Sequence, residues 1–242
     1  MSKPLLSVIT TVYNCEKYIE YSLNSLFSQK FQDFELILVN DGSTDGTWSL
    51  IQSLTEPHRD QVTLISHDDN LRIPTRRNEA ISLSKSKYLA INDGDDFSFD
   101  YRFQGQIEFL ENNPDIFCVG GLAERMNGKD VGGIMDYPPE RHDEILNMIT
   151  KKCMNPIIDP TTIFCRNVFN KLGGYTLEKS IYTVLDFDLW TRAILKGYKF
   201  HNIQYPVIKY RINPKGMTIL HKKEMIKAHM IVWRRFMREY KK

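Results

Sequence analysis

The sequence predicts an α/β fold whose central sheet is mostly parallel and is flanked by helices. In the first 121 residues, short runs rich in β-branched residues alternate with amphipathic stretches, which is the pattern of repeated βαβ units. Polar and acidic residues follow the ends of these runs, where open parallel sheets bind their ligands. After Gly121 this regular alternation ends, and the sequence predicts loops rich in Gly and Pro. We therefore expect a second lobe of the same domain.

The expected strands of the first half are short apolar runs bounded by turn residues. They cover residues 5–12, 35–40, 62–67, 88–92 and 116–121. Helices are expected at 16–29, 45–54, 74–83 and 99–111. The first carries an apolar stripe at helical spacing, and Pro74 suits a first helical turn. In the second half we expect a helix at 185–195 and strands at 199–203 and 205–211.

The composition is that of an ordinary globular protein. A chain of 242 residues, 42% hydrophobic and 26% charged, can bury the core of one large domain. Its net charge of +2 argues against a general nucleic-acid binder, which needs a strong basic excess. The four cysteines are scattered, without the close Cys/His pairs of a structural zinc site. There is no signal-peptide layout and no run of roughly 20 apolar residues, so we expect a cytoplasmic location.

The positive charge is concentrated in the C-terminal segment, residues 221–242. Residues 221–242 hold five Lys and three Arg against two Glu, a net charge of +6 that leaves −4 on the first 220 residues. Residues 220–240 predict an amphipathic helix with one side formed by Met225, His229, Val232, Trp233 and Phe236. A basic helix with such a face can lie on an anionic membrane. Two expectations therefore stay open: peripheral association with the inner membrane surface, or packing of this face on the core.

Acidic side chains follow several strand ends: Asp41 after the second, Asp68-Asp69 after the third and Asp93-Gly94-Asp95-Asp96 after the fourth. Carboxylates gathered at one sheet edge repel each other, and a divalent cation is the natural counter-charge. Their hard oxygen ligands suit Mg²⁺ or Mn²⁺ better than zinc, and Gly94 lets the backbone approach a ligand closely. The structural alternative is an acidic turn in which Asp96 caps the next helix.

The second strand end suggests a nucleoside pocket. We expect Asp41 to accept a hydrogen bond from a base N–H and Tyr13 to lie flat against the base. Arg77 and Asn78, in the helix after the third strand, could approach the base or the phosphates. Arg76 is expected on the solvated face of that helix. Residues 41–46 are also good turn formers, so a plain turn is the alternative there.

These residues form an ordered series that resembles the family 2 glycosyltransferases of the GT-A fold. The series is Ser7-Val8-Ile9-Thr10-Thr11-Val12-Tyr13-Asn14, then Val39-Asn40-Asp41-Gly42-Ser43-Thr44-Asp45-Gly46-Thr47, then Arg77-Asn78, then Asp93-Gly94-Asp95-Asp96. Further on, Leu172-Gly173-Gly174-Tyr175 resembles the family's Gly-Gly-aromatic acceptor segment, and Asp186-Phe187-Asp188-Leu189-Trp190 resembles its acidic helix start. The resemblance covers about residues 5–218.

The resemblance implies a nucleotide-sugar donor, by default a UDP sugar, and assigns residues to it. The implied donor-binding residues are Thr11, Val12, Tyr13, Asp41, Arg77, Asp93, Gly94, Asp95 and Arg211. Asp93 and Asp95 match the family's DxD element and would hold Mn²⁺ or Mg²⁺. Tyr210-Arg211 resembles a late Tyr-Arg element, but Asn213 stands where His is often found, so packing remains an alternative role for Arg211.

Asp186 matches the catalytic base of inverting members. It would remove the proton of the acceptor hydroxyl as the oxygen attacks the anomeric carbon. Leu185 stands where many members carry a second acid, so Asp188 is kept as the fallback base, with a structural or capping role as its alternative. Many members also carry Gly where this chain has Arg72.

The implied function is transfer of one hexose or N-acetylhexosamine to a saccharide or lipid-linked saccharide acceptor, in surface polysaccharide or O-antigen biosynthesis. Residues 1–121 would bind the donor, residues 122–218 would carry the acceptor site and the base, and residues 219–242 would form the terminal helix. A non-catalytic binding module of the same fold is the main alternative. A nucleotidyltransferase is disfavoured because residues 10–16 contain no glycine, and the Gly-x-Gly-x-x-Gly turn of an NAD-dependent enzyme is missing there too.

Overall fold

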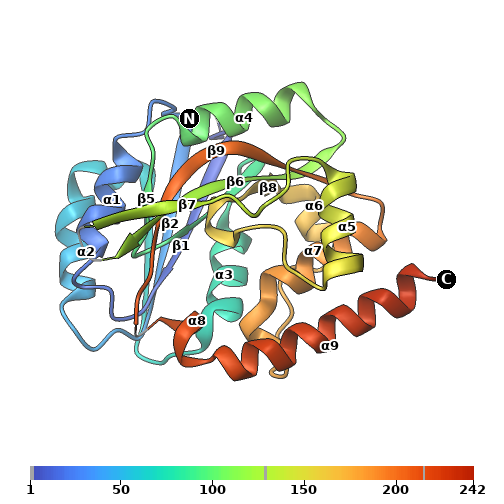
Figure 1. The fold of residues 1–242 in the computed structure, drawn as a ribbon. Helices are drawn as coiled ribbons and strands as arrows, with labels where there is room; N and C mark the ends of the chain where they lie inside the picture. The colour runs from blue at the N-terminus through green and yellow to red at the C-terminus, as the bar shows by residue number, and fades with distance from the viewer. Residues whose placement is uncertain (1–2, 128–129, 215) are drawn as a thin grey trace.

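The computed structural model of the chain describes residues 3–127, 130–214 and 216–242. Its strands form one sheet in the order β3-β2-β1-β4-β8-β6-β9-β5, and β7 pairs with β6. The strands are β1 (Leu6–Val12), β2 (Phe34–Asp41), β3 (Val62–His67), β4 (Tyr88–Asp93), β5 (Phe97–Ser98), β6 (Ile116–Asn127), β7 (Asp130–Met135), β8 (Ile163–Cys165) and β9 (Lys199–Arg211). Figure 1 shows this sheet running through the centre of the molecule. The mixed α/β class with a mostly parallel central sheet is confirmed.

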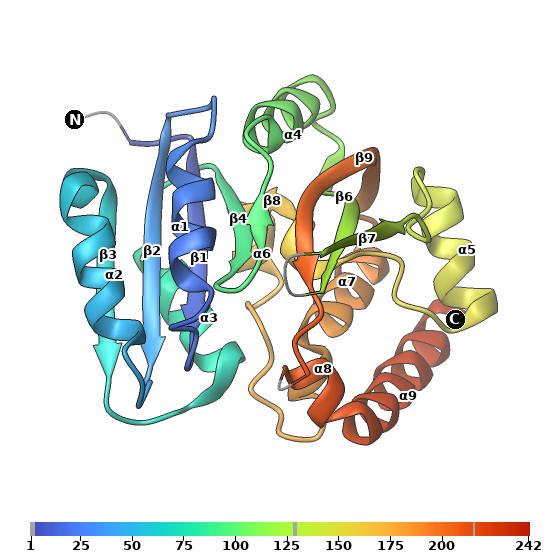
Figure 2. The same ribbon diagram turned by 60° about the vertical axis from the view of Figure 1, so that its left-hand side comes forward.

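Helices cover both faces of the sheet. They are α1 (Ile19–Phe27), α2 (Thr47–Thr55), α3 (Arg72–Leu83), α4 (Arg102–Asn112), α5 (His142–Lys152), α6 (Arg166–Lys171), α7 (Leu185–Leu195), α8 (Met217–Leu220) and α9 (Lys222–Tyr240), with short 3₁₀ turns η1 (Glu56–Gln61), η2 (Asp159–Thr161) and η3 (Tyr182–Val184). Core residues of α1, α2 and α4 pack on one face, whereas those of α3, α5, α7 and α9 pack on the other. Figure 2 shows α1 and α3 on opposite sides of β1 and β2.

The amino-terminal strands are apolar on both faces because both faces are covered. Val8 and Leu36 belong to the cluster beneath α1, while their chain neighbours Ile9 and Ile37 belong to the cluster beneath α3. All four side chains are at most 1% exposed. Strands β1, β2, β3 and β4 pair in parallel, so their near-continuous apolar runs are those of a buried parallel sheet. Their carboxyl ends therefore share one edge.

The expected strands of the first half are confirmed to within a residue, except that β6 continues to Asn127, past Gly121. The two late strands expected at 199–203 and 205–211 are one strand, β9, that runs through Pro206. The register between β6 and β9 shifts around Leu122, which pairs with Pro206. Such an irregularity lets a strand accommodate a proline that cannot donate to the ladder. The strands β5, β7 and β8 and the helices α5 and α6 were not expected from the sequence.

Helix α9 packs its apolar side onto the body of the protein. Ala228, Val232 and Phe236 are each 1% exposed and belong to the core cluster beneath α3 and α7. The indole N–H of Trp233 donates to the carbonyl of Ile149 at 2.8 Å, and the His229 ring stacks on Phe187. Of the two expectations for this helix, packing on the core is confirmed, so its Met-rich and aromatic face is not available to a membrane. No helix in the described ranges is both long and apolar enough to span a bilayer.

Candidate active site at the carboxyl ends of the parallel strands

The ends of the four parallel strands bring the expected donor-binding residues to one edge of the sheet. Thr11 pairs with Asp93 across the β1–β4 ladder, and Asp41 ends β2 one position beyond the β1 pairing of Asn40. The side chain of Val12 is 2% exposed, whereas Tyr13 is 49% exposed just past the strand end. Tyr13 is thus a large aromatic ring left on the surface at this edge.

The Asp41 carboxylate is held by the start of α3. Its two oxygens accept hydrogen bonds from the backbone N–H groups of Leu71 and Arg72, both at 2.9 Å, and from the Nε of Arg76 at 2.7 Å. Arg72 adopts φ 71°, a left-handed conformation that favours glycine. Its guanidinium lies over the ring of Tyr182, which joins the start of α3 to η3.

Arg76 is not on a solvated helix face, as the sequence had suggested. It is 3% exposed and forms ion pairs with Asp41, Asp69 and Glu79. The physical reason is the acidity of this edge: Asp41 ends β2 and Asp69 follows the end of β3, and the buried carboxylate of Asp41 needs a paired cation. Arg76 therefore serves as the internal counter-charge for Asp41.

The turn Asp93–Asp96 packs closely on β1. A Cβ on Gly94 would lie 2.6 Å from Cγ1 of Val12, so glycine is required here to avoid a clash with the strand. Burial raises the pKa of Asp93 to about 6; Arg77 opposes this rise, while Asp159 and Asp95 add to it by repulsion. Burial also raises the pKa of Asp95. The turn is thus a site where negative charge is only partly compensated.

Asp96 does not cap a helix. Its Oδ1 accepts a hydrogen bond from the backbone N–H of Arg211 at 2.8 Å, while its Oδ2 is buried and has no partner within the described ranges. Burial and repulsion from Asp95 and Asp93 raise the pKa of Asp96 well above its usual range. The Nε of Arg211 donates to the carbonyl of Asp95 at 2.9 Å, and its guanidinium lies over the Tyr18 ring. Arg211 thus braces the acidic turn from β9.

The residues of this turn fit a hard divalent cation. Asp93 and Asp95 supply carboxylate oxygens. Burial raises the pKa of both carboxyls, and a bound cation would offset this cost of holding their negative charge away from water. Among the residues that the structure describes, no three His, Cys, Asp or Glu side chains converge as a closed metal cage. Mg²⁺ commonly binds through one or two carboxylates together with substrate phosphates, so two aspartates suffice for that type of site.

Arg77 joins the acidic turn to the second half of the chain. It is 3% exposed, and its guanidinium donates to Oδ1 of Asp93 at 3.0 Å and to Oδ2 of Asp159 at 2.5 Å. The Tyr175 ring lies 5.8 Å from the guanidinium carbon. Asp159 in η2 was not expected at the site from the sequence. Its second oxygen, Oδ1, is buried and has no partner in the described part of the chain.

Asp186 lies in the first turn of α7, close to this network. Its Oδ2 accepts a hydrogen bond from Nδ2 of Asn155 at 2.7 Å. Burial raises the pKa of Asp186 to about 7, with repulsion from Asp159 adding to the rise; Asn155 and Arg77 oppose it. A carboxylate with a pKa near neutrality can both accept and release a proton at physiological pH. Asn155 was missed in the sequence because a lone Asn before Pro156 reads as a turn residue.

Asp188, the alternative candidate for the base, is paired with an arginine. It is 8% exposed, and its Oδ2 accepts from Nε of Arg192 at 2.8 Å. Arg192 in turn donates to the carbonyls of Leu172 and Gly174 at 2.6 and 2.8 Å. This chain of contacts fixes the Gly-Gly turn before Tyr175. Asp188 therefore has the contacts of a structural residue.

Asn78 holds the same turn from the other side. Its side-chain amide bonds both backbone groups of Tyr175, donating to the carbonyl at 2.8 Å and accepting from the N–H at 2.9 Å. Gly173 and Gly174 adopt φ 81° and 75°, which only glycine does without strain. Asn78 is thus committed to positioning Tyr175 beside Arg77.

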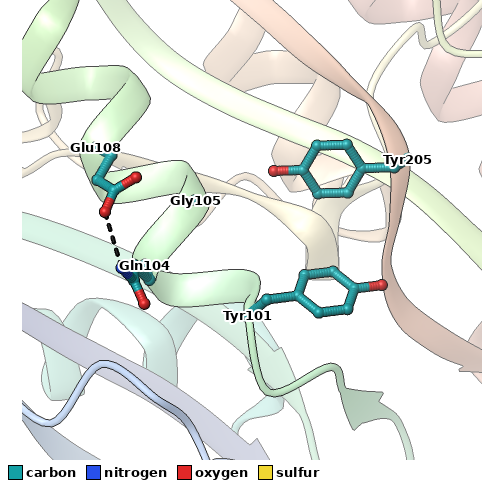
Figure 3. A pocket seen from close by; sticks show the side chains of 5 residues that line it. All are labelled: Tyr101, Gln104, Gly105, Glu108 and Tyr205. Carbon is teal, nitrogen blue, oxygen red and sulfur yellow. Dashed lines mark hydrogen bonds between the residues drawn. The ribbon is translucent and has the colours of Figure 1, made fainter.

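A separate hollow lies between α4 and β9. It is lined by Tyr101, Gln104, Gly105, Glu108 and Tyr205 (Figure 3). The two tyrosine rings meet edge to face with centroids 5.9 Å apart, and Gln104 donates to Glu108 at 2.9 Å. A Cβ on Gly105 would lie 2.7 Å from the Tyr205 hydroxyl, so the glycine lets Tyr205 sit against α4. None of the strand-end acids lines this hollow, which is therefore not part of the candidate active site.

Solved structures with the same arrangement are GT-A glycosyltransferases, and the fold of this chain is of that class. S. aureus TarS in complex with UDP superposes with a TM-score of 0.70 at 21% identity, covering 96% of this chain and 65% of that one. The mannosyltransferase PcManGT from Pyrobaculum calidifontis, in complex with GDP-Man and Mn²⁺, has a TM-score of 0.71 at 18% identity, covering 97% and 65%. This chain thus spans 65% of the length of either solved chain.

A family profile and related sequences identify the family of this chain. The profile of the family described as Glycosyl transferase family 2 matches residues 7–173. EpsE of Bacillus subtilis, which is named as a glycosyltransferase, is 31% identical over 210 residues, covering 87% of this chain and 74% of that protein. The UDP-Glc:alpha-D-GlcNAc-diphosphoundecaprenol beta-1,3-glucosyltransferase WfaP of Escherichia coli is 26% identical over 94% of this chain and 85% of that protein. The chain belongs to glycosyltransferase family 2.

Proposed function

We propose that this chain is an inverting glycosyltransferase that moves one hexose or N-acetylhexosamine from a UDP sugar to a saccharide acceptor. The observation that carries this proposal is the contrast between two carboxylates on α7. Asp186 has a pKa of about 7 and one hydrogen bond from Asn155, whereas Asp188 is committed to Arg192. An alcohol nucleophile needs a general base, and a single carboxyl group whose pKa lies near neutral pH can serve as one.

In this mechanism Asp186 accepts the proton of the acceptor hydroxyl. The oxygen then forms its bond to the anomeric carbon as the bond from that carbon to the diphosphate oxygen breaks, so the configuration inverts. Repulsion from Asp159 keeps Asp186 basic enough to accept the proton, while Asn155 orients its oxygen. A glycoside hydrolase would instead need two carboxylates flanking the sugar, and Asp188 is not available for that role.

The donor occupies the strand-end edge in this proposal. The nucleotide would lie along Thr11, Val12, Tyr13, Asp41 and Gly94, with Tyr13 against the base and Asp41 facing a base N–H. Arg77 and Arg211 would support it through the acidic turn, to which both are hydrogen-bonded. Because both Asp41 oxygens already accept hydrogen bonds, the base would use a remaining lone pair. Residues 1–121 thus bind the donor, and residues 122–218 carry the acceptor site and Asp186.

Asp93 and Asp95 would hold Mn²⁺ or Mg²⁺ in this proposal. When bound, such an ion supplies positive charge beside the departing diphosphate. Arg77 and Arg211 act from behind the turn: Arg77 bonds an Asp93 oxygen and Arg211 bonds the Asp95 carbonyl. Arg77 would thereby orient the Asp93 carboxylate, and Arg211 would hold the backbone of the turn that carries Asp95.

The proposed acceptor is a saccharide linked to a lipid diphosphate, in surface polysaccharide biosynthesis of the O-antigen type. Its support is the named activity of WfaP, which acts on a diphosphoundecaprenol-linked GlcNAc. Such an acceptor is presented at the cytoplasmic face of the membrane, so we place the protein in the cytoplasm with peripheral attachment through the region of α9. No nucleic-acid partner is proposed.

The test uses the full chain with a panel of nucleotide sugars and Mn²⁺. Thermal shift identifies the donor, and release of UDP is then measured with diphosphate-linked and free saccharide acceptors. NMR of the product reports the anomeric configuration. An inverted product and acceptor-dependent UDP release are expected. Donor binding without turnover on any acceptor would favour a non-catalytic module, and a retained configuration would contradict the role of Asp186.

A further inference from the structure

The outward side of α9 carries a stripe of cations. Lys223, Lys227, Arg234, Arg238 and Lys241 follow one another at spacings of four, seven, four and three residues, which places them on one side of a helix. All five are exposed. They lie away from the core-facing residues of the helix, and we call this set the basic face. Figure 2 shows α9 along the outer edge of the molecule.

The charge of the basic face is not neutralised by the protein. Within the described ranges Lys223, Lys227 and Arg234 form no ion pair, and Arg238 has only its chain neighbour Glu239, with 3.7 Å between the charged atoms. The first 220 residues carry a net charge of −4, against +6 from residue 221 onward. Soluble surfaces usually intersperse both signs. A one-signed stripe on an otherwise acidic protein is the footprint of an anionic partner.

Large aliphatic side chains lie at the amino-terminal end of this stripe. Ile219 and Leu220 in α8 are 47% and 63% exposed, and Ile226 in the first turns of α9 is 57% exposed. A soluble polyanion would pair with the lysines but would gain nothing from these side chains. An anionic bilayer suits both, because cations lie among its headgroups and aliphatic side chains enter the acyl boundary.

The aliphatic end is also the end nearest the acidic turn. Strand β9 finishes at Arg211, whose N–H bonds Asp96, and α8 begins at Met217. The side chain of Thr218 in α8 lies near the hydroxyl of Tyr210, whose pKa it lowers. Helix α8 is thus tied to the strand that braces the candidate active site, and α9 extends from it along the outside of the molecule (Figure 1).

We propose that the basic face, together with Ile219, Leu220 and Ile226, is a docking surface for an anionic lipid bilayer. It holds the protein with the α8 end, and hence the rim of the candidate active site, at the membrane. This surface is the reverse of the Met-rich side that the sequence had suggested. Membrane binding stands independently of the reaction; only its use in presenting a lipid-linked acceptor rests on the proposed function.

The test is co-sedimentation of the full chain with vesicles of phosphatidylcholine alone or mixed with an equal part of phosphatidylglycerol. Strong binding is expected only with phosphatidylglycerol. The variant Lys223→Glu/Lys227→Glu/Arg234→Glu should lower partitioning by at least on the order of 100-fold, because the loss of each surface cation alone costs roughly fivefold. Leu220→Ser/Ile226→Ser should weaken binding to the same vesicles with the charge unchanged, and soluble polyglutamate should compete poorly.

The matched control reverses three cations elsewhere: Lys85→Glu/Lys171→Glu/Lys196→Glu changes the net charge equally at exposed positions on other elements. It should bind phosphatidylglycerol vesicles within a few-fold of the wild type. Equal binding of the wild type to both vesicle types, or equal loss in the control, would overturn the proposal, as would an unaffected serine variant together with strong polyglutamate competition. Donor binding without vesicles should be unchanged in all variants, so failure of the proposed reaction would be seen separately.

Discussion

Arg77 donates a hydrogen bond to Asp159 across 82 positions of the chain, so a helix of the donor half and a 3₁₀ turn of the other half share one buried ion pair. The same guanidinium bonds Asp93 at 3.0 Å. Its contacts therefore link the acidic turn, η2 and, through repulsion from Asp159, the proposed base Asp186.

Arg77→Ala should lower the free energy of unfolding by about 3–5 kcal/mol, because it leaves Asp93 and Asp159 without their buried counter-charge. Urea unfolding followed by circular dichroism measures this loss. Arg59→Ala is the control: Arg59 is exposed and pairs only loosely with Glu56, so a change within about 0.5 kcal/mol is expected. A loss below about 1 kcal/mol for Arg77→Ala would contradict the buried role of this arginine.

Asp188→Asn should cost stability without impairing donor binding. The amide weakens the ion pair with Arg192, which in turn holds the carbonyls of Leu172 and Gly174. We expect a loss of about 1–3 kcal/mol, measured by urea unfolding, together with faster proteolysis of the loop before η3. Unchanged stability with complete loss of transfer would instead make Asp188 the base.

Asp95→Ala should abolish metal-dependent UDP binding, because one of the two carboxylates proposed to hold the ion is removed. Calorimetry with UDP and Mn²⁺ should show affinity at least on the order of 100-fold weaker, equal to that of the wild type in a chelator. Asp100→Ala removes an exposed carboxylate paired with Lys30 and should bind like the wild type. Equal UDP affinities of wild type and Asp95→Ala would rule out the metal role.

The pH profile of kcat/KM should have an acidic limb near pH 7, since Asp186 must be ionised to accept a proton and its pKa is about 7. Asp159→Asn removes a repelling charge, which favours the ionised form of Asp186 and lowers its pKa. The limb should therefore move to lower pH in this variant. A limb that stays in place would show that Asp159 does not control the base.

The sequence predicted the parallel half of the sheet because both faces of β1, β2 and β4 are buried and their residues are continuously apolar. It missed β8 because three residues, Ile163–Cys165, are too few to show any periodicity. Helix α5 could have been found: its core-facing Ile145, Met148 and Ile149 recur at helical spacing. The missed elements are mostly those whose partners lie far along the chain.

Within the candidate site, the strand-end acids could be predicted from their position after apolar runs. The contacts of Arg76 and Arg77 could not, since adjacent arginines on a helix look alike in sequence. Asp41 and Asp93 end different strands; Asp41 forms an ion pair with Arg76, and Asp93 forms one with Arg77. Asp159 and Asn155 were missed for the same reason: tertiary packing brings a loop of the second half against α3 and α7.

The most direct measurement of the central claim is transfer by Asp186→Asn at saturating donor, with donor affinity determined in the same samples. The amide keeps an oxygen that can accept the Asn155 hydrogen bond but cannot take a proton from the acceptor. Because the pKa of Asp186 is raised from 3.8 to about 7, the cost of ionising it in the folded protein develops between these two pH values and is fully present above pH 7. This variant should therefore melt no lower than the wild type at alkaline pH. We predict UDP-sugar affinity within about threefold of the wild type and transfer slower by at least about 10³-fold. Transfer within tenfold of the wild type would contradict the assignment of Asp186 as the base.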